Sequence, residues 1–168
     1  ARTCARRARG RRRGRRAPRI AGAIFTAAGL LLPHLECGKR VDAAALRAAM
    51  ETAFGASDAT GTWDWKTAYD ACEAATVLFL RKYGRALFRK AGTPAARLAA
   101  LSKITSLLPT PPRRSEDSQA LQQFSTPVPL GLAAIAAAAI TPHDIVLEPS
   151  AGTGLLAILA EISGGFAG

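Results

Sequence analysis

The amino-acid sequence predicts an α/β protein in which a helical N-terminal region is followed by the first strand–loop–helix unit of a doubly wound sheet. Apolar residues recur at helical spacing between residues 43 and 108, which indicates amphipathic helices. Between residues 144 and 162, a short apolar run, a turn with two glycines and an apolar helix follow one another. This order of elements opens the doubly wound α/β folds.

The composition changes along the chain and divides it into four segments. The first segment is rich in arginine, and the third combines Pro, Ser and charged residues, as linkers do. The predicted segments are a disordered basic tail at residues 1–19, a helical domain at 20–108, a linker at 109–121 and the start of the α/β domain at 122–168.

The tail carries most of the net charge of +11, because it holds ten arginines and no acidic residue. Three interpretations stay open: a basic arm that neutralises nucleic-acid phosphates, the positive end of an export signal, and a solvated low-complexity extension. We favour the solvated extension, because Arg, Gly and Ala repeats carry little specific information. Export is the weakest, since the apolar run at residues 20–32 lacks an A-x-A site and is too short to span a bilayer of about 30 Å. A short buried helix explains this run equally well, and no membrane partner is expected.

Capping residues mark the first two helices of the helical domain. Asp42 is the expected N-cap of a helix at residues 43–54. A second helix is expected at about residues 65–83, and Gly84 stands where its C-terminal cap would lie. The domain is therefore predicted to be a small helical bundle.

The third helix of the bundle has a clear beginning and a clear end in the sequence. The Thr93 hydroxyl can cap its first turn, and Pro94 then occupies the first helical position. Its apolar stripe runs as far as Pro109, which cannot continue a helix.

The cysteine, histidine and tryptophan residues do not form a recognisable ligand-binding pattern. The three cysteines are widely spaced and only two histidines occur, so neither a metal site nor a disulfide framework is expected. Such thiols suit a reducing cytoplasm. Trp63 and Trp65 could stack on bases, but we favour them as packing anchors. His143 precedes the predicted strand on the side away from the glycines, so we assign it to the surface and not to catalysis.

The final segment contains the elements on which the fold class depends. An alanine-rich stretch at residues 129–140 has almost no polar face, which is typical of a buried helix. Residues 144–148 (DIVLE) are suited to a buried parallel strand. A glycine turn at residues 151–154 and a helix at residues 155–162 follow.

The glycine turn indicates a cofactor site. Glycines let a ligand approach the backbone closely, and a helix N-terminus offers free N–H donors. Glu148, which ends the predicted strand, would attract the cationic amino end of S-adenosylmethionine but would repel a pyrophosphate. A dinucleotide fingerprint, Gly152-x-Gly154-x-x-Ala157, is the alternative, although Ser150 stands where its first glycine belongs. A purely structural glycine turn is the other alternative. We favour S-adenosylmethionine over both.

A second motif precedes the alanine-rich helix and makes a family resemblance specific. Gln123-Phe124-Ser125-Thr126-Pro127, followed by a helix and by Glu148-Pro149-Ser150-Ala151-Gly152-Thr153-Gly154, resembles the N-terminal signature of amino-directed, adenine-N6 DNA methyltransferases. Gln122-Gln123 replaces the Gly-Gln that is common in the family. The resemblance implies a Rossmann-like S-adenosylmethionine-binding fold. It implies that Phe124, Ser125, Thr126 and Pro127 line the methionine end and that Glu148 meets the amino group. Pro149 is expected to lie at the cofactor as well, and Ser150, Ala151, Gly152, Thr153 and Gly154 are expected to supply backbone contacts.

A narrower resemblance covers roughly residues 20–168. The helical segment contains Asp64-Trp65-Lys66-Thr67-Ala68-Tyr69-Asp70-Ala71 and Phe79-Leu80-Arg81-Lys82. Followed by the two motifs, it is similar to bacterial and phage strawberry notch-like proteins, in which a methylase-like domain precedes a helicase. This implies a SAM-dependent methyltransferase within a larger protein that acts on DNA. The alternative is a non-catalytic helical interaction or scaffold module of such a helicase.

The motif that carries methyl transfer in this family is missing from the sequence. The family reads its target amine with (Asp/Asn)-Pro-Pro-(Tyr/Phe/Trp), and no such tetrapeptide occurs here. Only 20 residues follow Glu148, too few for the remaining strands of a doubly wound sheet. We therefore expect a truncated domain that is inactive alone, and we assign no catalytic residue in it. We also expect an exposed apolar face on the last helix, formed by Leu155, Leu156, Ile158 and Leu159.

Overall fold

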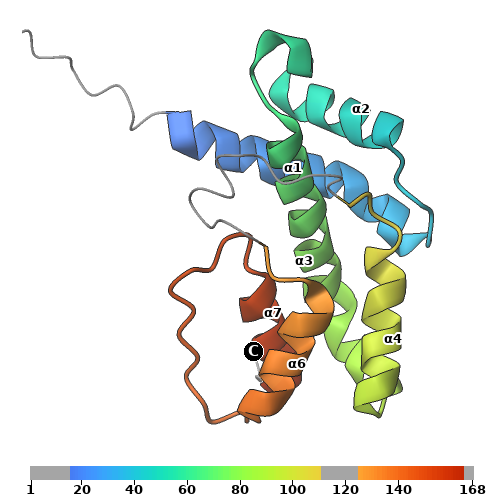
Figure 1. The fold of residues 1–168 in the computed structure, drawn as a ribbon, viewed down its shortest axis with the longest axis vertical. Coiled ribbons are helices and arrows are strands. Elements are labelled where there is room, and N and C mark those ends of the chain that lie inside the picture. Colours follow the sequence, from blue (N-terminus) through green and yellow to red (C-terminus); the bar gives the residue numbers. More distant parts are fainter. Residues whose placement is uncertain (1–15, 111–124, 165–168) are drawn as a thin grey trace, which may run out of the picture.

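The computed structural model describes residues 16–110 and 125–164, and in these two ranges the regular structure is entirely helical (Figure 1). The helices are α1 (Arg16–Glu36), α2 (Ala43–Phe54), the short 3₁₀ helix η1 (Asp58–Thr60), α3 (Trp65–Lys90), α4 (Pro94–Thr105), α6 (Val128–Ala138) and α7 (Leu155–Gly164).

The predicted α/β fold class is wrong for the part of the chain that the structure describes. The strand expected at residues 144–148 does not form, and the described residues contain no sheet. Ile145 is 100% exposed and Leu147 is 86% exposed, so the apolar run that was expected to be buried faces solvent. A strand needs a neighbour to pair its N–H and C=O groups. No described segment lies beside this run as a strand, so it remains an irregular connection between α6 and α7.

Two hydrophobic clusters form the core, and α3 contributes to both of them. The first half of α3 packs with α1 and α2, whereas its second half packs with α4 and α7 (Figure 1). Helix α6 joins the second cluster by packing on α4 and α7. The large members of the first cluster are Leu31, Leu35, Val41, Leu46, Met50, Trp63 and Leu108. Those of the second are Leu80, Phe88, Leu101, Leu132, Ile135, Leu155, Ile158, Leu159 and Ile162.

Helix α1 contains the apolar run of residues 20–32 and extends beyond it to Glu36. Ala27, Ala28 and Leu31 are buried in the first cluster, so one stripe of this run is a packing face, whereas Phe25 is 53% exposed. No helix within the described ranges is long and apolar enough to cross a membrane.

The predicted starts of the helices are confirmed by their caps. The Asp42 carboxylate accepts a hydrogen bond from the Ala45 amide at 2.8 Å, and α2 covers the predicted residues. The Thr93 hydroxyl accepts one from the Ala96 amide at 3.2 Å, with Pro94 at the first helical position of α4. These side chains satisfy amides that no helical carbonyl can reach.

The predicted end of the second helix at Tyr83 is wrong, because α3 continues through Gly84 to Lys90. Gly84 is buried, and a Cβ atom at this position would lie 2.9 Å from Ile162 Cδ1 of α7. The glycine therefore does not cap α3. Its missing side chain allows α7 to approach the helix closely.

Helix α7 buries the face that was expected to be exposed. Leu155, Ile158 and Leu159 are buried against α3 and α6, and only Leu156 of the four stays half-buried. The expectation was wrong because it assumed that only a sheet could cover this helix. Two helices cover it instead.

Candidate functional site

Helices α6 and α7 pack in parallel, so their N-termini lie at the same end of the pair. Near the start of α6, a Cβ atom at Gly131 would lie 2.9 Å from Leu159 Cδ1 and 3.1 Å from Leu156 Cδ2. Farther along, Ala136 and Ser163, the latter near the end of α7, line one small hollow. The connection between the helices returns alongside them (Figure 1). The segment before α6 and the glycine turn before α7 are thus placed at one end.

The glycine turn has a backbone that favours glycine at two positions. Gly152 has φ of +54° and Gly154 has φ of +92°, a region that residues with a Cβ rarely adopt. The Gly154 amide donates to the Ala151 carbonyl at 2.6 Å, and the Gly154 carbonyl accepts the first hydrogen bond of α7, from Ile158. The amides that precede this bond point out of the helix end, where an anion or a carbonyl group of a ligand is favoured.

Glu148 lies directly before the turn and is half-buried. Its Oε1 accepts a hydrogen bond from the Ser150 amide at 2.9 Å, which folds the carboxylate over its own turn. Pro149 and Ala151 are exposed. A cationic group that reached this carboxylate would find it already oriented.

Thr153 provides a polar atom that lacks a partner. Its Oγ1 is enclosed and makes no hydrogen bond with any residue in the described ranges. A buried hydroxyl without a hydrogen bond lowers the stability of the fold, unless a ligand or a water molecule bonds to it. Residues 148–155 therefore offer a carboxylate, a hydroxyl without a hydrogen-bond partner in the described ranges and the first amide of α7, a set that suits a zwitterionic ligand.

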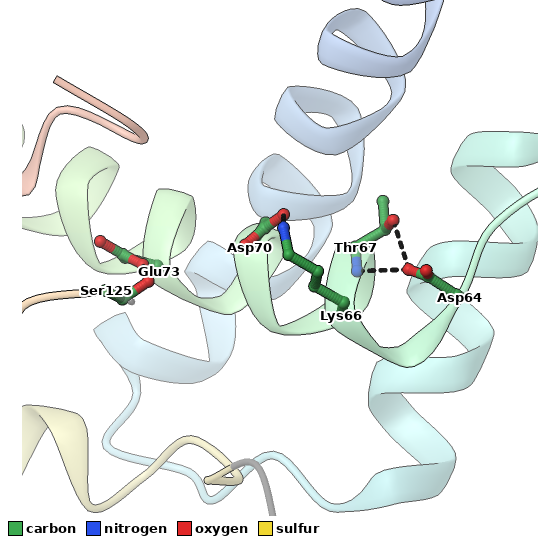
Figure 2. A network of polar contacts seen from close by, with 6 residues as sticks. All are labelled: Asp64, Lys66, Thr67, Asp70, Glu73 and Ser125. Atoms are coloured by element: carbon green, nitrogen blue, oxygen red, sulfur yellow. Dashed lines mark hydrogen bonds and ion pairs between the residues drawn. The ribbon is translucent and has the colours of Figure 1, made fainter. Parts of the chain in front are cut away.

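The structure describes three of the four residues in the other predicted segment, residues 124–127, which precedes α6. Phe124 lies outside the described residues, so its predicted role is not examined by the structure. Ser125 is exposed and donates a hydrogen bond to Glu73 of α3 (Figure 2). Thr126 is half-buried, and the Pro127 carbonyl accepts the first hydrogen bond of α6, from the Gly131 amide at 3.0 Å.

Figure 2 shows the polar groups along the first half of α3 that surround this contact. Lys66 pairs with Asp70 at 3.5 Å, and the pKa of Asp70 is raised by burial, an effect that the charge on Lys66 opposes. Asp64 caps α3 by accepting from the Thr67 amide at 2.7 Å. Partial burial acts in the opposite direction, but the hydrogen bonds from Thr67 hold the pKa of Asp64 below its ordinary value.

Glu73 is the residue that sequence reasoning missed. It lies 52 residues before Ser125, on a helix that was assigned to a separate domain. Its spacing fits the amphipathic pattern of α3, and no local motif distinguishes it from other surface carboxylates. Only the tertiary fold, in which the segment before α6 reaches α3, brings the two side chains together.

Two hollows occur elsewhere in the described residues. One of about 330 Å³ is lined by Glu36, Phe79, Tyr83, Ala86, Leu87 and Lys90. The smaller hollow, of about 160 Å³, lies between α4, α6 and α7. Neither is lined by a predicted cofactor residue. The described ranges also hold no cluster of three or more His, Cys, Asp or Glu side chains that could bind a metal ion.

The tryptophans lie far along the chain from both motifs and serve packing. Trp63 is 4% exposed and its Nε1 donates to the Ala56 carbonyl at 2.8 Å, so the prediction of a packing anchor is confirmed for it. Trp65 is half-buried, and the Arg47 guanidinium lies 5.5 Å from its ring centroid.

No protein-family model, curated protein or solved structure matches the chain. The resemblance therefore rests on the sequence motifs at residues 64–71, 79–82 and 122–154 alone.

Proposed function

We propose that the chain is the S-adenosylmethionine-binding portion of an amino-directed, adenine-N6-like DNA methyltransferase, within a larger methylase and helicase protein. The observation that supports this best is the parallel packing of α6 and α7. It brings residues 125–127 and the glycine turn to one end of a helix pair. A cofactor bound at that end would contact both segments at once, as the resemblance implies.

Each segment offers a group that suits a different part of the cofactor. The Glu148 carboxylate would attract the amino group, and the amides at the start of α7 together with the Thr153 hydroxyl would donate hydrogen bonds. Residues 125–127 would line the methionine end. The cofactor supplies an electrophilic sulfonium methyl group, and the protein contributes alignment and exclusion of water.

DNA is the proposed partner of the larger protein. An exocyclic amine must leave the base stack before it can accept a methyl group, and the family holds it with an (Asp/Asn)-Pro-Pro-aromatic loop. Since the 168 residues contain no such tetrapeptide, the proposal assigns them cofactor binding and not methyl transfer.

An NMR titration of the isotope-labelled chain with S-adenosylmethionine tests the proposal. We expect the amide signals of Gly152, Gly154 and Leu155 to shift, with a dissociation constant on the order of 1 mM. Glu148→Gln should weaken binding about tenfold, because it removes one charge-assisted interaction. Glu51→Gln, on α2 away from the site, is the matched control and should bind like the wild type. Absence of shifts at the turn, or equal shifts with NADH, would overturn the proposal.

A non-catalytic scaffold is the second candidate, and the covered face of α7 favours it. Because α7 packs on α3 and α6, the described residues form one helical assembly in which the glycine turn is a connection. This candidate predicts that Glu148→Ala leaves the function of the larger protein unchanged. The methyltransferase proposal predicts that this substitution abolishes cofactor binding.

A further inference from the structure

The hydrogen bond between Ser125 and Glu73 joins the helical region to one of the two proposed cofactor segments (Figure 2). Ser125 stands two residues before Pro127, whose carbonyl accepts the first hydrogen bond of α6. A constraint on Ser125 therefore fixes the direction in which the chain enters α6. It also limits the positions open to Thr126, which the proposal places at the methionine end.

Glu73 is well placed to impose this constraint because its helix is firmly held. Its neighbours Cys72, Ala74 and Ala75 are buried in the first hydrophobic cluster, and Glu73 itself is half-buried. A fixed backbone and a restricted side chain reduce the entropy lost when the hydrogen bond forms. A hydroxyl that donates to a carboxylate makes a charge-assisted bond, which is stronger than one between neutral groups.

The polar neighbours of Glu73 leave its carboxylate available to Ser125. Lys66, the nearest lysine in the network, is paired with Asp70, one turn away from Glu73 on the same helix. Asp70 and Glu73 carry like charges, so a donor that satisfies Glu73 also reduces the cost of placing them together.

The same helix also contacts α7, the helix that follows the glycine turn. A Cβ atom at Gly84 would lie 2.9 Å from Ile162 Cδ1, and Arg85 pairs with Glu161 at 3.5 Å, both near the C-terminal end of α7. One continuous helix of 26 residues therefore contacts the segment before α6 and the far end of α7.

We propose that Glu73 is a positioning residue for the cofactor site: through Ser125 it fixes the start of α6 and with it the segment at residues 125–127. The expected effect of Glu73 on cofactor binding rests on the proposed function. The structural part, that Glu73 orders the start of α6, stands independently of any ligand.

Two variants separate the hydrogen bond from the charge. Glu73→Ala removes the acceptor, whereas Glu73→Gln keeps an oxygen that can accept from Ser125 and removes the charge. Glu51→Ala on α2 is the matched control. The reporter is the Gly131 amide, which makes the first hydrogen bond of α6, and the Ile158 amide reports on the start of α7.

Hydrogen exchange followed by NMR gives the first readout. We expect Glu73→Ala to raise the exchange rate of the Gly131 amide about tenfold, the effect of losing one charge-assisted hydrogen bond, with the Ile158 amide unchanged. Glu73→Gln should retain most of the protection, and Glu51→Ala all of it. Wild-type exchange in Glu73→Ala would overturn the proposal, and so would an equal loss in Glu73→Gln.

Titration with S-adenosylmethionine gives the second readout. Glu73→Ala should weaken binding about fivefold, because the bound arrangement of residues 125–127 must then be ordered by the ligand. Unchanged affinity would overturn the role in the site. If the wild-type chain binds no S-adenosylmethionine, the proposed function fails, and the exchange experiment still decides whether Glu73 orders the start of α6.

Discussion

Single glycines in this chain serve two different physical purposes. At Gly152 and Gly154 the backbone lies in the left-handed region, where a side chain adds strain. At Gly84 and Gly131 the backbone is helical, and a side chain would instead meet a neighbouring helix. Substitutions at the two kinds of position should therefore lower the stability for different reasons, conformational strain at the turn and steric overlap within the helices.

Gly154→Ala tests the strain at the turn. We expect it to lower the free energy of unfolding by about 1–2 kcal/mol, the cost of a left-handed backbone for a residue with a Cβ. Gly29→Ala is the control, because Gly29 is exposed in α1 with open space around it, and alanine there should stabilise by about 0.5–1 kcal/mol. Urea denaturation measures both. Equal effects of the two substitutions would show that the turn carries no strain.

The two described cysteines should differ in reactivity. Burial raises the pKa of Cys72 to about 12, whereas Cys37 is exposed. At pH 8 the Cys72 thiol is protonated and enclosed, so we expect iodoacetamide to modify Cys37 and to spare Cys72 until the chain unfolds. Peptide mapping by mass spectrometry checks this. Modification of both at the same rate in the native chain would contradict it.

The shift of Cys72 also has a consequence for stability. Above pH 9.0, the ordinary pKa of a cysteine thiol, Cys72 loses its proton in the unfolded state but keeps it in the folded state. The protonated thiol therefore makes its full contribution to the free energy of unfolding below pH 9, and this contribution is lost as the pH rises toward 12. Replacement by Ala should flatten the decline in stability over this alkaline range.

At the scale of elements, the contact between α3 and α7 depends on the pairing of a small residue with a large one. Gly84→Leu should lower the free energy of unfolding by about 1–3 kcal/mol through overpacking against Ile162. The double variant Gly84→Leu/Ile162→Ala should be less destabilised than the sum of the single variants, because the smaller partner makes room. Simple additivity in thermal or urea unfolding would show that the two residues do not share this contact.

Local and distant interactions explain which elements could be predicted from the sequence. The caps at Asp42 and Thr93 act within three residues, so the helix starts were recognisable. Gly84 was misjudged because its partner, Ile162, lies 78 residues away. The glycine turn was located correctly, but its position beside the start of α6 depends on packing. The contact between Glu73 and Ser125 has no local signal at all.

The predicted strand failed for a different reason. Ile145 and its neighbours have the apolar, β-branched character that is typical of a strand, and the prediction rested on it. A strand, unlike a helix, completes its hydrogen bonds only with another segment. Local preference cannot supply that segment, and none lies beside residues 144–148 in the described ranges.

For the whole molecule, the uneven distribution of charge makes a separate prediction. Deletion of residues 1–15 removes eight arginines and no acidic residue, which lowers the net charge from +11 to +3. If the tail neutralises phosphates, the full chain should bind duplex DNA with an affinity that falls steeply with salt, and the deletion should remove most of that slope. Fluorescence anisotropy at several salt concentrations measures it. An unchanged slope would place any DNA affinity on the remaining residues.

The exposed run from Ile145 to Leu147 has a practical consequence for handling the protein. Segments that seed aggregation are uncharged, proline-free and about six residues long, and this exposed run of three apolar residues shares their composition but not their length. Asp144 and Glu148 flank it on either side, and like charges at both ends discourage two copies from stacking. Hydrogen bonds from Thr141 keep the pKa of Asp144 below its ordinary value, so this gatekeeper stays charged well into mildly acidic buffers.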